Sequence, residues 1–293
     1  MQAAARLERP FGAVMFDWDG TAVLDRRQDA SELRALVEAL CASGCQLVIT
    51  SGTHLENVDD QLGARPAGPG RLLISSNRGS EVWSIEQGGP LLLQRREARP
   101  GEDDALDRAA AATVAALAAR GLPTGEVSRR LNRRKLDLMP FPEWADPPKA
   151  QIAELLAATL ARLDGVGIGS LEEVCDLARA EGRAAGLGDP RVTTDAKHVE
   201  IGLTDKTDSS HEVFPRLAEL GVPASGVLVC GDEMGPLGGS PGSDSLMLAG
   251  DGRRATAISV GVEPEGVPDD VISLGGGPAR FLDLLRDQLV RRG

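Results

Sequence analysis

The chain has 293 residues, 42% apolar and 26% charged, which is ordinary for a globular protein that buries a core in one large or two modest domains. Its formal net charge of −12 argues against functions that depend on binding nucleic acid or an anionic membrane surface. An anionic substrate must therefore be met by a local group of basic side chains or by a metal ion.

The location of the protein is inferred from what its sequence lacks. No apolar run approaches the roughly 20 residues that span a bilayer. The segment 1–10 is charged and has no apolar stretch, so we expect no signal peptide. No paired CxxC spacing is present, so we expect neither a disulfide framework nor a zinc site, and we predict a cytoplasmic protein.

The first part of the chain alternates short strands with helices. Ala13–Phe16, Gln46–Thr50 and Leu72–Ile74 are apolar runs typical of buried strands. A helix is predicted from Asp29, whose spacing to Glu32 resembles a capping box. Strands and helices joined by short connections favour a parallel sheet covered on both faces.

The middle of the chain has another pattern. We predict two short strands within 80–94, a helix over 102–119, a strand over 135–139, helices over 147–163 and 171–183, and strands over 191–194 and 198–203. Such a mixture of helices and half-exposed strands is typical of an α+β domain.

The first pattern returns at Lys206, with a helix to about residue 220, strands over 227–230 and 255–260, and a closing helix over 281–289. The predicted fold is α/β, a Rossmann-like doubly wound parallel sheet with an inserted α+β cap domain. We assign 1–97 and 204–293 to the core and 98–203 to the cap.

Polar side chains follow three of the predicted core strands. Asp17, Ser51 and Asp232 each come directly after an apolar run. Because ligands of open parallel sheets collect at the carboxyl ends of the strands, we expect these residues to meet at one edge.

These residue types suit the cleavage of a phosphate ester. The Asp17 carboxylate can attack phosphorus and form an acyl-phosphate. Carboxylates of Asp17 and Asp232 are hard oxygen ligands of the kind that Mg²⁺ prefers. Asp19 points the same way as Asp17 if the strand continues, and it can then give and take a proton.

Phosphate oxygens also need fixed donors. Ser51 offers a hydroxyl and a backbone N–H, which we expect at the start of the next helix, where the dipole favours anions. Lys206 is also predicted at a helix start. An anionic partner would explain a lysine there, because the dipole disfavours a cation.

Four ordered motifs resemble those of the haloacid dehalogenase superfamily: Asp17-Trp18-Asp19-Gly20-Thr21, Ser51-Gly52, Lys206, and Gly231-Asp232 with a later Asp244. The insertion between the second and third motifs is similar to the large cap of the branch that contains the Cof-type sugar phosphatases and trehalose-6-phosphate phosphatase. The turn Asn77-Arg78-Gly79-Ser80-Glu81 is also similar to a turn of that branch.

The resemblance implies a role for each motif residue. Asp17 would be nucleophile and metal ligand, and Asp19 the general acid and then base, with its backbone carbonyl on the metal. Ser51, Gly52 and Lys206 would hold the phosphate. Asp232 and Asp244 would serve Mg²⁺.

The fourth motif departs from the family pattern. The family places its second acid within about five residues of the first, whereas a Gly- and Pro-rich insertion separates Asp232 from Asp244 here. Glu233 is therefore a rival ligand. We favour Asp244, because the residues after it continue like the family's helix start.

Three basic side chains are candidates for substrate binding. Arg133 and Lys135 belong to the main basic run, within the predicted cap, and could descend onto a polar substrate when the cap closes. Arg78 could face the pocket or lie in a surface turn. A solvated strand edge is the alternative for the run.

The predicted function is that of a magnesium-dependent phosphatase acting on a phosphorylated sugar, with trehalose-6-phosphate or a similar sugar phosphate as first choice, through an aspartyl-phosphate. A phosphomutase, or a phosphatase of an amino-cyclitol or other natural-product phosphate, is the alternative. A non-enzymatic binding module is disfavoured because the motif residues are all present. The expected partner is a small phosphate ester, and the oligomeric state is left open.

Overall fold

The computed structural model describes residues 6–293. Residues 1–5, on which part of the signal-peptide prediction rests, lie outside the described residues. Within 6–293, none of the helices combines the length and the apolarity that crossing a bilayer requires.

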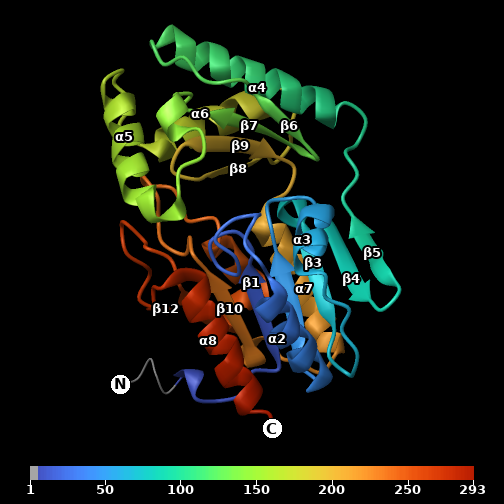
Figure 1. Cartoon of the computed structure of the whole chain (residues 1–293). Coiled ribbons are helices and arrows are strands. Elements are labelled where there is room, and N and C mark those ends of the chain that lie inside the picture. Colours follow the sequence, from blue (N-terminus) through green and yellow to red (C-terminus); the bar gives the residue numbers. More distant parts are fainter. Residues whose placement is uncertain (1–5) are drawn as a thin grey trace.

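The larger of two sheets has eight strands in the order β12-β11-β10-β1-β2-β3-β4-β5 (Figure 1). The strands from β12 to β3 run parallel, and β4 and β5 are antiparallel beside β3. Their bounds are β1 (Ala13–Asp17), β2 (Gln46–Thr50), β3 (Leu72–Ser76), β4 (Glu81–Glu86), β5 (Gly89–Arg95), β10 (Val227–Gly231), β11 (Thr256–Ser259) and β12 (Val271–Ser273).

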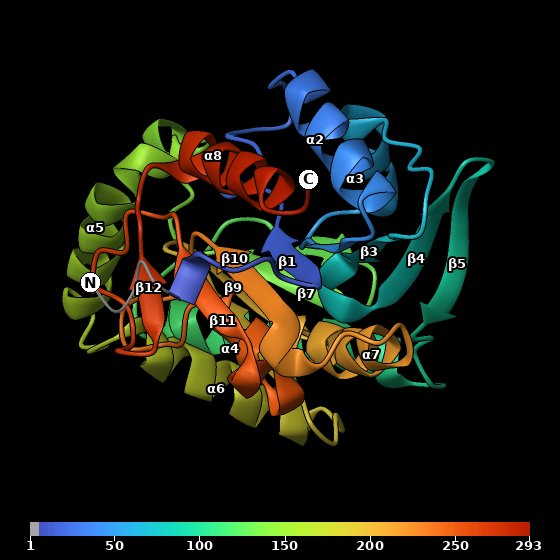
Figure 2. The same cartoon turned by 90° about the horizontal axis from the view of Figure 1, so that it is seen from below.

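Helices cover both faces of this sheet, as Figure 2 shows. On one face lie α2 (Ser31–Ala42), α3 (Leu55–Leu62) and α8 (Gly277–Val290), and on the other α7 (Lys206–Glu219). Alternation along β1 explains this arrangement: Val14 and Phe16 pack into the cluster with α2 and α8, whereas Met15 packs into the cluster with α7. The predicted doubly wound α/β core is confirmed.

One local prediction about a helix needs correction. The capping box at Asp29 does not form, because Asp29 Oδ1 accepts the N–H of Ser31, the first residue of α2.

The second sheet is antiparallel, in the order β6-β7-β9-β8. It consists of β6 (Ser128–Arg130), β7 (Arg133–Asp137), β8 (Arg191–Thr194) and β9 (His198–Gly202), and it packs with α4 (Glu102–Ala119), α5 (Ile152–Asp164) and α6 (Leu171–Ala184). Figure 1 shows this unit, the cap, above the carboxyl ends of the core strands, with α4 and α6 on its outer side.

Alternation in β7 and β9 divides the cap sheet into two faces. Leu136, Val199 and Ile201 join the apolar cluster formed with the helices. Arg133 and Glu200 lie on the opposite face, which is turned towards the core, and Arg133 reaches the core residue Gly52. The polar face of the cap sheet therefore covers the carboxyl ends of the core strands.

Another link between cap and core comes from residues 235–242 in the insertion between Asp232 and Asp244, and we call this segment the strap. Leu237 is 1% exposed and belongs to the apolar cluster of the cap. The carbonyl oxygen of Gly238 accepts the N–H of Leu171, at 3.0 Å, at the start of α6. The insertion thus joins the cap to the loop between the two acids. The domain boundaries at 97/98 and 203/204 remain a prediction.

Candidate active site

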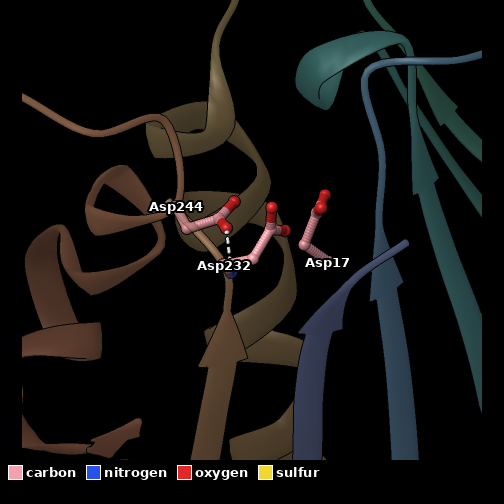
Figure 3. Close-up of side chains that lie close together, drawn as sticks. All are labelled: Asp17, Asp232 and Asp244. Carbon is pink, nitrogen blue, oxygen red and sulfur yellow. Dashed lines mark hydrogen bonds between the residues drawn. The ribbon is translucent and has the colours of Figure 1, made fainter. Parts of the chain in front are cut away.

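The ends of two neighbouring core strands bring the first two acids together. β1 ends at Asp17, and Asp232 follows β10, which pairs with β1 in parallel with Phe16 opposite Cys230. Asp244 completes a cluster in which one carboxylate oxygen from each residue lies within 4.8 Å of the others. Figure 3 shows the three side chains at the strand ends.

Asp244 is held by the loop that carries Asp232. Its Oδ2 accepts the N–H of Asp232 at 2.8 Å, drawn in Figure 3, and the N–H of Glu233 at 2.9 Å. A Cβ on Gly231 would lie 2.4 Å from this oxygen, so only glycine lets the carboxylate approach. Asp244, rather than Glu233, shares the cluster with Asp17 and Asp232.

Asp232 is surrounded by the turn that follows β1. Thr21 Oγ1 donates to Asp232 Oδ1 at 2.9 Å, a contact that the sequence analysis did not assign. Gly20 has a φ of +95°, and a Cβ there would lie 2.3 Å from Asp232 Oδ2. Gly20 is therefore required both by the backbone conformation and by the carboxylate beside it.

Lys206 is the first residue of α7, which begins with a capping box between Asp205 and Asp208. Its ammonium is buried and donates to Asp17 Oδ1 at 2.6 Å and to Asp244 Oδ1 at 2.5 Å. These two carboxylates offset the unfavourable helix dipole at this position.

The cluster carries more negative than positive charge. Burial raises the pKa of Asp17 well above its ordinary value, and Asp244 and Asp232 add to this against the opposing pull of Lys206. Burial also raises the pKa of Asp232 to about 6, and repulsion from the Asp244 carboxylate adds to this. Although burial acts to raise it, Lys206 holds the pKa of Asp244 below its ordinary value. A divalent cation would relieve this excess of negative charge.

The condition on which Asp19 would point the same way as Asp17, a strand that continues to Asp19, is not met. β1 ends at Asp17, and a turn begins at Trp18, whose carbonyl accepts the N–H of Ala22 at 2.9 Å. Asp19 is half-buried and makes an isolated bridge with Val23 within this turn. The shared direction of the Asp17 and Asp19 side chains therefore cannot be argued from strand alternation.

The prediction for Ser51 also needs a correction. α3 begins only at Leu55, and the Ser51 N–H donates to Ser75 O at 2.9 Å as the sheet continues. The neighbouring strand thus uses the donor that was expected to face an anion. The Ser51 hydroxyl is buried and accepts the N–H of Thr53 at 3.1 Å, next to Gly52.

A cap residue that sequence reasoning missed reaches the cluster. Lys149 Nζ lies 3.0 Å from Asp232 Oδ2 and 2.8 Å from Glu233 Oε1. It comes from a short 3₁₀ turn before α5, where a helix was predicted from Pro147. One lysine after two prolines carries no motif, so no signal in the sequence could have selected it.

Two of the three basic candidates converge on Gly52. Arg78 is not in a surface turn, since its side chain is 11% exposed and its Nε lies 2.6 Å from Glu200 Oε2. Arg133 Nη2 donates to Gly52 O across the boundary between cap and core. Lys135 shares the face of Arg133 by alternation, but its ammonium contacts no acceptor among residues 6–293.

No protein-family model matches this sequence, and no curated protein matches it. Solved structures match over nearly the whole chain. The N-terminally truncated, IMP-bound IMP-nucleotidase of Plasmodium falciparum has a TM-score of 0.56 at 10% identity, covering 99% of this chain and 70% of that one.

Two sugar-phosphate phosphatases match over nearly their full length. The trehalose-6-phosphate phosphatase of Aspergillus fumigatus has a TM-score of 0.53 at 14% identity, covering 98% of this chain and 96% of that one. The sucrose-phosphatase of a Synechocystis species, in complex with sucrose and phosphate, has a TM-score of 0.51 at 16% identity, covering 96% and 98%. The neighbours are phosphatases, and the fold expected from the resemblance to the haloacid dehalogenase superfamily is confirmed.

Proposed function

We propose that this chain is a metal-dependent phosphatase in which the Asp17 carboxylate attacks phosphorus. The observation that carries the proposal is the cluster at the strand ends, where Lys206 holds Asp17 Oδ1 at 2.6 Å next to Asp232 and Asp244. A buried carboxylate with a fixed orientation, beside acids that suit a divalent cation, is suited to nucleophilic attack on an anionic ester.

The donor set fits Mg²⁺. All three residues of the cluster offer hard carboxylate oxygens, and the two lysines in contact with them balance only part of their charge. Asp17, Asp232 and Asp244 would hold the ion, with the Asp19 carbonyl as a further predicted ligand. When bound, Mg²⁺ would relieve the repulsion between the Asp17 carboxylate and the phosphate.

The proposed reaction has two half-steps. An Asp17 oxygen forms a bond to phosphorus as the bond to the leaving oxygen breaks, and Asp19 gives that oxygen its proton. Asp19 then takes a proton from water, whose oxygen attacks phosphorus and releases phosphate with the Asp17 carboxylate restored. Lys206 and the Ser51 hydroxyl would hold the phosphoryl oxygens during both steps.

The proposed substrate is a phosphorylated sugar, with trehalose-6-phosphate as the first compound to test. The sugar-phosphate phosphatases among the structural neighbours support this choice, and the match covers nearly the whole of each of those chains. The IMP-nucleotidase adds nucleoside monophosphates to the panel. We also propose a cytoplasmic location, which four free, buried cysteines support.

The nucleophile is tested with Asp17→Asn. We expect phosphate release to fall by on the order of 10³-fold or more, because an amide cannot form the acyl-phosphate. Asp60→Asn, an exposed site on α3, is the matched control and should keep full activity. Retained turnover in Asp17→Asn, with a circular dichroism spectrum like the wild type, would refute the assignment.

The metal is tested by chelation. Phosphate release is measured across a panel of sugar phosphates and nucleoside monophosphates, which also identifies the substrate. Phosphate release should stop with EDTA and return with Mg²⁺. Hydrolysis that resists the chelator would contradict the proposal.

Conversion of a sugar 1-phosphate to its isomer without free phosphate, in the presence of a bisphosphate activator, would instead identify a phosphomutase.

A further inference from the structure

Two arginines from different parts of the chain meet over Gly52. Arg78 belongs to the turn between β3 and β4 of the core, and Arg133 begins β7 of the cap. A Cβ built on Gly52 would lie 3.7 Å from Arg133 Nη1 and 3.7 Å from Arg78 Nε. Gly52 follows the strand that ends beside Asp17, so both guanidinium groups lie next to the proposed phosphoryl site.

One carboxylate serves both arginines. Glu200 Oε2, from β9 of the cap, lies 2.6 Å from Arg78 Nε and 3.4 Å from Arg133 Nη1. At contact distance two positive charges therefore face one negative charge, while Glu233 and Asp195 act on Arg78 from farther away. Arg133 is only 7% exposed, so bulk water does not neutralise the surplus.

The donors of these guanidinium groups are also incompletely used. Arg78 Nη1 and Arg133 Nε are buried and have no hydrogen-bond acceptor among residues 6–293. Buried donors without acceptors are unfavourable, and a surplus charge beside them selects an anionic acceptor over a hydroxyl group.

The ionisation of Glu200 and Arg133 agrees with this charge balance. Although burial acts to lower it, Glu200 and two further acids raise the pKa of Arg78 above its ordinary value, so the surplus lies at Arg133. Although burial acts to raise it, Arg78, Arg133 and then Lys135 lower the pKa of Glu200 to about 2. Burial, together with repulsion from Arg78, lowers the pKa of Arg133 to about 10 despite the attraction of Glu200. Glu200 is thus held firmly as an anion, while Arg133 lacks a full counter-charge.

The backbone at Arg78 is strained in a way that supports a functional role. Asn77 and Arg78 have φ values of 51° and 53°, two consecutive non-glycine residues in the left-handed region. Their N–H groups donate to Thr53 O at 2.8 Å and to Ser51 O at 3.0 Å. The turn is therefore tied to the segment around Gly52, and this brings the Arg78 side chain to that segment.

We propose that Arg78 and Arg133 form an anion subsite beside the phosphoryl site, and that the preferred substrate is a phosphate ester with a second anionic group. This inference rests on the proposed phosphatase function. The second group is a carboxylate or another phosphate. Because one arginine comes from the core and the other from the cap, the subsite exists only when the cap lies over the strand ends.

The test compares esters that differ in one anionic group. Glycerol 3-phosphate is paired with 3-phosphoglycerate for a carboxylate, and glucose 6-phosphate with glucose 1,6-bisphosphate for a second phosphate. In the wild type, kcat/KM should be at least about 10-fold higher for the anionic member of one pair, as a charge-assisted hydrogen bond supplies. The pair that shows the preference identifies the group.

The variants are Arg133→Met and Arg78→Met. In each, the preference should fall to about 1, because kcat/KM falls more for the anionic ester than for the neutral ester. Arg130→Met removes an exposed arginine of β6 and should leave the preference intact. Arg133→Lys should retain part of it.

Two results would overturn the subsite. One is a wild type that prefers the neutral member of both pairs. The other is an equal loss on both members in Arg133→Met, which would mean that the arginine holds the transferring phosphoryl group or supports the fold. If Arg133→Met does not fold, Arg133→Met combined with Glu200→Gln removes the ion pair as a unit and replaces it in the test.

Calorimetry separates this proposal from the phosphatase itself. The same four esters are titrated into the Asp17→Asn protein with Mg²⁺. Tighter binding of the anionic members, with no wild-type hydrolysis of any ester, would retain the subsite and remove the phosphatase proposal. Efficient hydrolysis without any preference in binding or turnover would retain the phosphatase proposal and remove the subsite.

Discussion

Two lysines contact the same carboxylate cluster, one from the core and one from the cap. Lys206 is fixed at the start of α7, is 3% exposed, and binds Asp17 and Asp244. The Lys149 side chain is 38% exposed, sits on a short turn of the cap, and binds Asp232 and Glu233. The first charge is part of the core, whereas the second reaches the site only through the position of the cap.

The core therefore supplies a positive charge that is fixed in place, whereas the cap supplies one that depends on where the cap lies. The environment of Lys206 consists of groups held by strand ends and by a helix start, all within one sheet. Lys149 depends on how the cap is attached, and the strap is one of its attachments. Removing each lysine, and loosening the strap, should therefore have separable effects.

The largest effect is expected for Lys206→Met. Losing a fixed cation beside Asp17 should lower kcat by on the order of 10² to 10³-fold, as removing one donor to a developing oxyanion does. Steady-state kinetics with the best ester of the panel would measure this. Lys197→Met, at another buried lysine that is 4% exposed, is the matched control and should lose far less. Equal losses in both variants would make Lys206 a structural residue.

An intermediate effect is expected for Leu237→Ala in the strap. Truncating a leucine buried in the cap cluster should lower the free energy of unfolding by about 2–4 kcal/mol. Urea denaturation followed by circular dichroism would show this. Val262→Ala, at a side chain that is 61% exposed, should change it by less than about 0.5 kcal/mol. A similarly small change in Leu237→Ala would mean that the strap does not fasten the cap.

The smallest effect is expected for Lys149→Met. Its ammonium competes with a cation for Asp232, so its removal should tighten Mg²⁺ binding by roughly 3- to 10-fold. Isothermal titration calorimetry with Mg²⁺ alone measures this without turnover. Lys135→Met is the control, because Lys135 lies on the cap sheet without contacting the cluster. Unchanged or weaker Mg²⁺ binding in Lys149→Met alone would show that the contact with Asp232 has no influence on the metal.

Much of the core was predictable because its pattern is local. The strand that ends at Asp17 and the strand that ends just before Asp232 are both visible in the sequence as apolar runs followed by an acid. Because these strands are parallel, both acids lie at one edge of the sheet. Lys206 was predictable for a similar reason, since a cation at a helix start requires an anionic neighbour. The choice between Asp244 and Glu233 stayed open, because a loop of this length has no predictable path.

Other features depend on contacts between distant segments. The N–H of Ser51 donates to Ser75 O because β3 lies beside β2. The residue types around Ser51 do not reveal which strand lies beside it. The fold class was therefore predictable in full. Which hydrogen-bond donors around the site stay available for a ligand was not predictable.

The sequence by itself determined the α/β core and the acids and lysine that gather at its strand ends, since apolar periodicity and residue order are sufficient for both. Only the tertiary structure decided that Lys149 reaches Asp232, that Arg78 and Arg133 share Glu200 over Gly52, and that the strap enters the cap. The physical reason is the same in each case. These contacts join segments whose meeting depends on how the cap packs on the core, and single residues without a repeating pattern carry no record of that packing.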